Sequence, residues 1–441
     1  MNKVAPHIQP WLEAFAHVPP TPLSWLEEAR QRALQQFSSS GFPTRRQENW
    51  KYTDVNPLLK HAFTLNNTHS TLKAEEVAAL SLANWQGYTL IFVDGLLQTH
   101  LSQLPQQSGV YIAPLSQALE EHPQFVEKVF TQQTPWVSSF QLLNTLFAQH
   151  GSIIKVDDKT ILDKPLQLLW ISTQAEQACY TKNIIHLGKA AQAVVVENYQ
   201  SLAPENAHYF NHIMHYVSLE EQAHLTHYQL QEEHIQAYHI SQNLCQQARD
   251  SYYKHYQFDL GGRLSRHDLT VQLQGTGANC ELLGLFMPQG VQHVDNHTQI
   301  EHCVPHTQSK EYYKGVLNER ARAVFNGKVI VHEQAIKTAA ALNNHNLLLS
   351  AQAEINTKPE LEIYNDDVKC THGATIGQLD NDALFYLQSR GIELAKARDL
   401  LIYGFAHDVV AQVELRPLRD SLDKILLTHL PKQLTLLSEL W

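Results

Sequence analysis

Short apolar segments separated by polar turns dominate the chain from about residue 150 onward, and no long helical pattern interrupts them. Examples are LQLLWIS at 166–172, AVVVENY at 193–199, HLTHYQLQ at 224–231 and DLTVQLQG at 268–275. Short aliphatic runs and period-two alternation of this length are typical of strands. So many strands in succession predict an all-β body for this part of the chain.

The segment 323–377 bears on which β architecture this is. Its apolar residues predict very short strands at tight spacing, such as 329–331, 347–349 and 361–363. This pattern suits successive faces of a β-solenoid, and NNHN at 343–346 is compatible with polar turns between such faces. A β-sandwich remains equally compatible, because no strict repeat is present.

Helical patterns flank the β body. The segment TPLSWLEEARQRALQQF at 21–37 places apolar residues at helical spacing, and SSSGFP at 38–43 ends it. TLIFVDG at 89–95 is a strand candidate in the mixed region that follows. After residue 377, Asp380 or Asn381 can cap one helix, and Pro417 can open the last one.

These patterns predict three parts. We expect an N-terminal helical and mixed domain at 1–150, a β core at 151–378 and a C-terminal helical domain at 379–441. A helical domain as small as the last can dock on the β body or on another protein.

Charge and hydropathy narrow the function classes. The 441 residues carry a formal net charge of −11, and no run of lysine and arginine is long enough to follow a phosphate backbone, so we expect no nucleic-acid partner. The first residues, MNKVAPHIQPWLEAF, lack the apolar stretch of a signal peptide. No segment approaches the roughly 20 apolar residues that a membrane-spanning helix needs. These features predict a cytoplasmic protein without membrane spans.

Several catalytic signatures are incomplete. GTGANC at 275–280 lacks the last glycine of the dinucleotide fingerprint, and NGKV at 326–329 lacks the upstream glycine of a Walker A loop. HEQAI at 332–336 lacks the second histidine of a zinc-protease motif. No G-x-S-x-G elbow is present. We therefore expect that this chain binds and hydrolyses no ATP itself.

The stretch DDVKCTHGATIG at 366–377 holds the first candidate site. If it is extended, Cys370 and His372 project to the same face, where a thiol and an imidazole can approach one iron or zinc ion. Two ligands do not complete a tetrahedral centre, so distant residues or another chain would have to supply the rest. The alternative is structural, with Cys370 as a small buried side chain and His372 as a hydrogen-bonded turn residue.

A second candidate is HVDNHTQIEHCVPH at 293–306, which contains His293, His297, His302, Cys303 and His306. Four imidazoles and one thiol could bind a metal, but their spacing matches no ligand template. We interpret this segment as structural. The five cysteines of the chain, an odd number without a C-x-x-C pair, predict free thiols: Cys179, Cys245, Cys280, Cys303 and Cys370.

Four long landmarks in order along the chain resemble one known family. They are RRQENWKYTD at 45–54, RAVFNGKVIV at 322–331, NNHNLLLS at 343–350 and YNDDVKCTHGATIGQLDNDALFYLQSRGI at 364–392. Together they closely resemble the SufD family, which belongs to the bacterial Suf machinery for iron–sulfur cluster assembly. The landmarks span both ends and the middle of the chain.

The resemblance implies a mainly β fold with a right-handed parallel β-helix core between N-terminal and C-terminal helical domains. It implies a noncatalytic scaffold subunit that pairs with a SufB-like paralogue and binds a SufC-like ABC ATPase chiefly through its C-terminal helices. The family motif KC-x-HGAT falls on Cys370 and His372, which would hold iron or a transient iron–sulfur cluster at the contact with the paralogue. Neither the residues nor the resemblance specifies flavin, the cluster type, or pairing with a second copy when the chain is alone.

Two other readings compete with the scaffold. One is a self-sufficient β-helix enzyme, such as a polysaccharide lyase or a metal-dependent hydrolase, that would use Asp366, Asp367 and Lys369; adjacent strand residues point to opposite faces, which argues against joint action by the two aspartates. The other is a self-contained metal-binding module that relies on the histidines. Capture of an ATPase would favour the scaffold, and activity or stable iron in the lone chain would favour the others.

Overall fold

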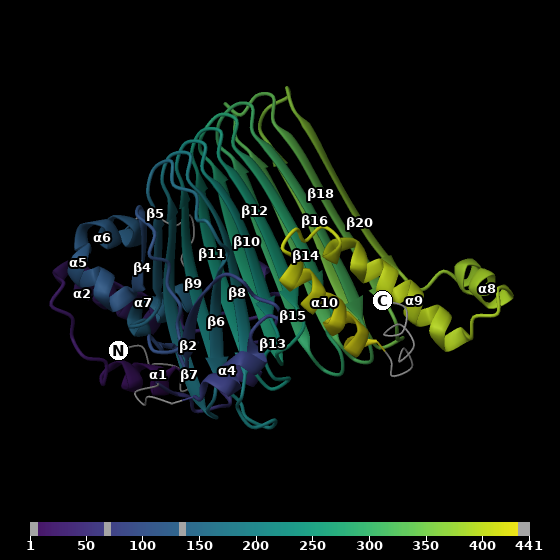
Figure 1. Ribbon diagram of the computed structural model, residues 1–441, viewed down its shortest axis with the longest axis horizontal. Coiled ribbons are helices and arrows are strands. Elements are labelled where there is room, and N and C mark those ends of the chain that lie inside the picture. The colour runs from purple at the N-terminus through teal and green to yellow at the C-terminus, as the bar shows by residue number, and fades with distance from the viewer. Residues whose placement is uncertain (1–7, 66–71, 132–137, 431–441) are drawn as a thin grey trace.

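The computed structural model describes residues 8–65, 72–131 and 138–430, and it consists of two long parallel sheets with helices at both ends of the chain (Figure 1). From β5 onward, successive strands alternate between the sheets, so each strand pairs in parallel with the strand two places away along the chain. Before that, β3 and β4 pair antiparallel with β2 and β5 at the N-terminal ends of the two sheets. This is a flattened β-solenoid with two strands in each turn. It confirms the solenoid and excludes the sandwich, because consecutive strands never pair within the solenoid turns of the described chain.

One sheet, here the odd sheet, has the strand order β19-β17-β15-β13-β11-β9-β7-β5-β4, with β1 paired to β7. Its strands are β1 (Thr64–Leu65), β4 (Val110–Pro114), β5 (Ser152–Val156), β7 (Gln177–Leu187), β9 (Phe210–Leu219), β11 (Tyr238–Gln247), β13 (Leu264–Leu273), β15 (His293–His302), β17 (Arg322–Val331) and β19 (Glu354–Ile363).

The other, the even sheet, has the order β20-β18-β16-β14-β12-β10-β8-β6-β2-β3. Its strands are β2 (Tyr88–Val93), β3 (Leu96–Leu97), β6 (Leu166–Ser172), β8 (Gln192–Ser201), β10 (His224–Gln231), β12 (Tyr252–Asp259), β14 (Asn279–Phe286), β16 (Gln308–Leu317), β18 (Ala339–Leu348) and β20 (Lys369–Gly377).

The helices lie outside the two sheets. They are α1 (Gln9–Phe15), α2 (Ser24–Ser40), the 3-10 helix η1 (Glu48–Trp50), α3 (Asn56–Leu59), α4 (Ala74–Leu80), α5 (Leu115–Glu121), α6 (Pro123–Thr131), α7 (Ser139–Phe147), α8 (Asn381–Ser389), α9 (Leu394–Val410) and α10 (Arg416–His429). Among the described helices, none is long and apolar enough to cross a membrane.

The length of one solenoid turn varies, which is why the sequence shows no strict repeat. The turn that leads from Tyr238 to its partner Leu264 is shorter than the turn that leads from Arg322 to its partner Glu354. Most strands are eight to eleven residues long, so the expectation of very short strands in 323–377 is wrong. NNHN at 343–346 is not a turn either, because it lies inside β18.

The NNHN error has a physical reason, which is that the solenoid interior accepts polar side chains when they bond to one another. Asn344 and Asn346 are buried, and Asn346 Nδ2 donates to Asn344 Oδ1 at 2.5 Å. Asn344 Nδ2 donates to the carbonyl of Tyr313 at 3.2 Å. A buried amide is tolerated when its hydrogen bonds are made inside the protein, so asparagine does not have to mark a turn.

A larger polar cluster crosses the interior of the earlier turns. The carboxylate of Glu197 on β8 contacts His215 Nε2 at 2.7 Å and His227 Nε2 at 3.0 Å, and it also accepts from Gln229. Burial alone would raise the pKa of Glu197, but the two imidazoles offset this effect and hold the pKa well below its usual value. Between such clusters, aliphatic and aromatic side chains from both sheets form the main core, including Val271, Leu282 and Phe325.

The N-terminal landmark RRQENWKYTD attaches the helical segment to the odd sheet. The indole of Trp50 covers the guanidinium of Arg266, with 3.8 Å between the ring centroid and Arg266 Cζ. Arg266 Nη1 also donates to the carbonyl of Asn49 at 2.9 Å. Thr53 Oγ1 donates to Asp295 Oδ2 at 2.5 Å. Trp50 is buried whereas Tyr52 is exposed, so the first of these aromatic side chains carries the packing.

The C-terminal helices α9 and α10 pack on the outer face of the even sheet (Figure 1). Val409 and Leu422 share a buried cluster with Phe258 and Leu285 of the sheet. Asp380 caps α8 through hydrogen bonds from the backbone nitrogens of Asp382 and Ala383, as the sequence predicted. Helix α8 itself projects away from the sheets.

The expected division at 150 and 378 stays a prediction. Strand β5 begins at Ser152 and β20 ends at Gly377, close to the two expected boundaries. However, β2, β3 and β4 extend the two sheets from within the segment 88–114, so the expected N-terminal domain also supplies strands to the solenoid.

Candidate functional site

The last solenoid turn, β19 and β20, is the candidate site, and we call it the open end. Among the described strands, β19 pairs only with β17 and β20 only with β18. Every residue of β20 is exposed or half-buried, although the side chains on its inner face continue the rows that line the interior. Ile363, Tyr364 and Ile376 are 42%, 59% and 52% exposed there. The open end therefore presents both backbone hydrogen-bonding groups and apolar side chains to other molecules.

Cys370 and His372 share the inner face of β20. Cys370 pairs with Ala340 and His372 with Leu342, and both of these partners belong to the interior core. Cys370 is half-buried against that core, whereas His372 is exposed. The two side chains therefore lie on one face, as the two-residue spacing predicts for a strand.

The surroundings of the two side chains differ in what they allow. Burial raises the pKa of the Cys370 thiol, and a hydrogen bond with the backbone of Ala340 partly offsets this. The thiol is therefore protonated near neutral pH unless an ion or a partner displaces the proton. The imidazole of His372 is exposed, so a metal ion or a partner can reach it directly.

Cys370 and His372 do not belong to a complete ligand set within the described residues. Groups of three or more potential ligand atoms within 4.8 Å of one another include neither residue there. A complete coordination shell at the open end would need ligands from outside the described part of this chain.

The acidic residues before β20 have a structural contact. Asp367 Oδ2 pairs with Lys337 Nζ at 2.8 Å, and both side chains are more than half exposed. This ion pair joins two successive turns at the edge of the even sheet. It engages one of the carboxylates on which a self-sufficient enzyme would depend.

The histidines of 293–306 do not converge on one point. His293 hydrogen-bonds to Thr53 at 2.9 Å, His297 pairs with Asp295 at 2.9 Å, and His306 is exposed. His302 points into the interior, where its Nδ1 and Nε2 lie 2.7 and 2.9 Å from the hydroxyls of Thr307 and Ser309. Most of this histidine-rich segment therefore anchors β15 to its surroundings.

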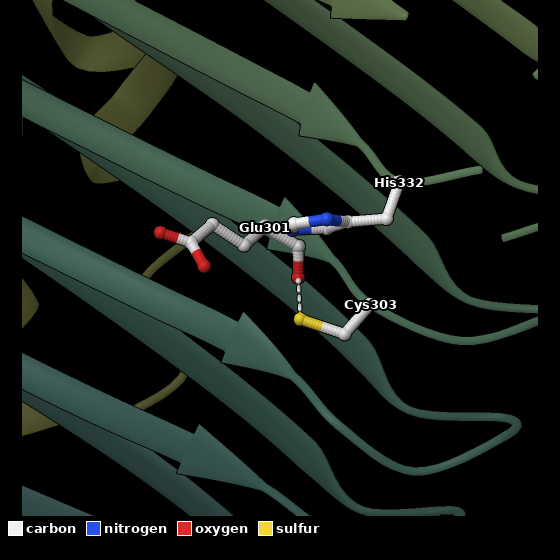
Figure 2. A group of neighbouring side chains, drawn as sticks. All are labelled: Glu301, Cys303 and His332. Carbon is white, nitrogen blue, oxygen red and sulfur yellow. Dashed lines mark hydrogen bonds between the residues drawn. The ribbon is translucent and has the colours of Figure 1, made fainter. Parts of the chain in front are cut away.

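Cys303 has neighbours that sequence reasoning missed. One ligand atom from each of Glu301, Cys303 and His332 lies within 4.8 Å of the other two, at the place where β15 and β17 end (Figure 2). His302 pairs with Val331 in the odd sheet, so the next residues, Cys303 and His332, lie side by side. The length of this solenoid turn is the signal that would have revealed the neighbour, because Cys303 and His332 are separated by one such turn.

Two family models together match most of the described residues. Residues 170–405 match the family model described as "SUF system FeS cluster assembly, SufBD core domain". Residues 9–168 match "SufBD protein N-terminal region", so the family boundary falls near residue 169, inside β6. The core model alone covers more than half of the chain.

Individual relatives agree over nearly full length. The iron–sulfur cluster assembly protein SufD of Escherichia coli (strain K12) is 33% identical over 86% of this chain and 87% of its own. The SufBD family protein slr0076 of Synechocystis is 32% identical over 93% of this chain and 92% of its own. SufD of Bacillus subtilis is 26% identical over 95% and 97%. With both family models in order and this coverage, the chain belongs to the SufD family.

Proposed function

We propose that this chain is a noncatalytic scaffold subunit of a Suf complex that assembles iron–sulfur clusters in the cytoplasm. The observation that carries the proposal is the open end, where a family motif lies on a strand whose edge and inner face are both accessible. The printed names of the relatives, iron–sulfur cluster assembly proteins, support the same role.

The open end is proposed to dock on a paralogous SufB-type subunit. An unpaired strand edge can add a strand from another chain, because its backbone donors and acceptors are already aligned. The exposed side chains of Ile363, Tyr364 and Ile376 would lose contact with water in such a contact. Cys370 and His372, which are an incomplete set of ligands, would then face the partner.

Iron is proposed as the cargo at this contact, with His372 as the ligand from this chain. Its imidazole is exposed, whereas the Cys370 thiol is half-buried and must first lose a proton. Cys370 would assist as thiolate or line the site. The paralogue would complete the coordination shell, since two ligands cannot form a tetrahedral centre.

Helices α8 to α10 are proposed to bind a SufC-type ABC ATPase. On α8, Phe385 is 72% exposed and Tyr386 is 57% exposed, and such aromatic side chains are typical anchors of protein contacts. Helix α9 contacts β14 and β16, and Asp408 bonds to both Tyr312 and Lys314 of β16. Closure of the ATPase could therefore displace β16, which pairs with β18, which pairs with β20.

The test is co-expression of this chain, carrying His372→Ala, with its SufB-type and SufC-type partners. We expect an intact complex whose iron and sulfide content falls at least about tenfold. Removing a group that only supports a metal ligand already costs about that much, and His372 would be a ligand itself. The matched control is Thr371→Ala, because its side chain lies on the opposite face of β20. Wild-type cluster content in His372→Ala would refute the ligand role, and failure to assemble would make the residue structural.

A further inference from the structure

We propose that Glu301, Cys303 and His332 form a second metal site, one that binds a divalent ion of the Zn²⁺ and Fe²⁺ class with three ligands from this chain alone. The site lies on the outer side of the odd sheet, where β15 and β17 end, and is separate from Cys370 and His372 on β20 of the even sheet. This inference goes beyond the scaffold function and does not rest on it.

The register of the two strands explains why the three side chains meet. Glu301 pairs with Ile330, and the backbone nitrogen of His332 donates to the carbonyl of His302 at 3.1 Å, which extends the pairing past the end of β17. Glu301 and Cys303 are two residues apart and share a face, and His332 lies on the same face of the next turn. Figure 2 shows the thiol and the imidazole beside the backbone of residue 301.

The distances require only a small closure. Tetrahedral bonds of about 2.0–2.3 Å place ligand atoms about 3.3–3.8 Å apart. The three ligand atoms here already lie within 4.8 Å of one another without any ion. A rotamer adjustment on the order of 1 Å would therefore complete the geometry, which side chains at the ends of strands can provide.

His332 has a coordinating atom available. Its Nε2 is buried and has no hydrogen-bond partner among the described residues. Leaving a buried polar atom unpaired costs about 1–3 kcal/mol, so an ion at this point would remove a penalty that the fold otherwise carries. Its neighbour His302, in contrast, has both ring nitrogens bonded.

Hydrogen bonds from neighbouring amides hold the carboxylate of Glu301, as outer-shell groups commonly hold a metal ligand. Its side chain is buried, with the residue 8% exposed, and its two carboxylate oxygens accept from Gln272 Nε2 at 3.2 Å and Gln299 Nε2 at 2.5 Å. Gln246 in turn donates to Gln272 at 3.1 Å. Amide donors fix the orientation of the carboxylate, which is the usual role of groups around a metal ligand.

The donor set selects the class of ion. One thiolate, one imidazole and one carboxylate suit Zn²⁺ or Fe²⁺, whereas Mg²⁺ and Ca²⁺ prefer oxygen ligands alone. Three protein ligands leave a fourth position for water or a small anion, so the site would exchange its ion more readily than a closed four-ligand site.

Binding must release a proton, because the Cys303 thiol hydrogen-bonds to the carbonyl of Glu301 at 3.6 Å. The sulfur–hydrogen bond breaks, a sulfur–metal bond forms, and the proton leaves to solvent. Because binding releases this proton, affinity for the ion should rise with pH.

The experiment is a Co²⁺ titration of the full chain carrying Cys370→Ser and His372→Ala, so that the open end contributes no ligand. We expect one equivalent of Co²⁺ with a thiolate-to-cobalt charge-transfer band, displaced by Zn²⁺. Cys303→Ser should abolish the band, and His332→Ala should weaken Co²⁺ affinity at least tenfold. His306→Asn, an exposed position three residues from Cys303, is the matched control and should bind like the parent.

Either of two results would overturn the proposal: a parent protein that binds Co²⁺ without a thiolate band, or a band that survives Cys303→Ser. Because the parent lacks both open-end ligands, neither result bears on the scaffold function. Conversely, a loss of cluster assembly in His372→Ala would neither support nor contradict the metal site at Cys303.

Discussion

Strands β6 and β20 belong to the same sheet, and their surroundings are opposite. All seven residues of β6 are buried, whereas every residue of β20 is exposed or half-buried. Strand β6 has a neighbour on each side, β2 and β8. Its inner face joins the interior core through Leu168, and its outer face packs under Val77 of α4 through Leu169.

Among the described strands, β20 has one neighbour, β18, and α9 packs on β14 and β16. The helices at the C-terminal end thus stabilise the side of the even sheet and leave the end of the solenoid accessible. Burial in this fold therefore comes from the next turn, so the last turn is stable only through its predecessor and remains available for a partner.

The comparison predicts that buried charges in the covered turns matter far more than exposed charges near the open end. Arg266 lies between Asp268 Oδ1 at 2.7 Å and Asp295 Oδ2 at 2.5 Å, and all three residues are buried. Arg266→Ala would leave two buried carboxylates without their cation. We expect a loss of about 3–5 kcal/mol in the free energy of unfolding, measured by urea denaturation.

The control for Arg266 is Arg322→Ala in the same sheet. The guanidinium of Arg322 lies 3.5 Å from Glu354, and the two side chains are 66% and 55% exposed. Removal of an exposed ion pair should change the free energy of unfolding by less than about 1 kcal/mol. Equal losses in the two variants would contradict the contrast between covered and open turns.

The pH dependence of stability should also come from the covered interior. Burial lowers the pKa of His302 to about 3, whereas an unfolded histidine titrates near 6.5. Between these values the unfolded chain binds more protons, so stability falls as pH decreases from about 6.5 toward 3. The largest slope from this one residue is about 1.4 kcal/mol per pH unit, or about 2 kcal/mol by pH 5.

Replacement of His302 by Gln, which can still hydrogen-bond to Thr307 and Ser309, should flatten this part of the pH profile. Urea denaturation at a series of pH values between 7 and 5 measures the slope. His306→Gln is the control, because it removes an exposed imidazole four residues away. An unchanged slope in His302→Gln would mean that other buried groups account for the acid sensitivity.

The sequence indicated much of this fold, and its limits have physical causes. Short apolar runs revealed the strands, but the length of a turn varies along the solenoid, so the register could not be read from a repeat. Buried polar residues such as Asn344 and Glu197 interrupt the apolar pattern, because their partners lie on other turns. Helix signals at Asp380 and Pro417 were local, and the structure bears them out.

The candidate site shows the same limit. The two-residue spacing placed Cys370 and His372 on one face, but their accessibility depends on where the solenoid ends. The neighbourhood of Cys303 and His332 required the register of β15 and β17, which no pattern within either segment contains. The expectation that a partner chain contacts Cys370 and His372 came from the family resemblance, because spacing alone did not say where further ligands would come from.

The smallest effect on stability is expected where exposure is greatest. Ile376→Lys at the open end and Phe385→Ser on α8 each replace an exposed apolar side chain, so each should change the free energy of unfolding by about 0.5 kcal/mol or less. If the two surfaces serve different partners, the variants should separate in co-purification: Ile376→Lys should lose the SufB-type subunit and keep the ATPase, and Phe385→Ser should do the reverse. Loss of both partners by either variant would mean that the two surfaces act as one, and would end the distinction between an open end that docks and a helical domain that couples.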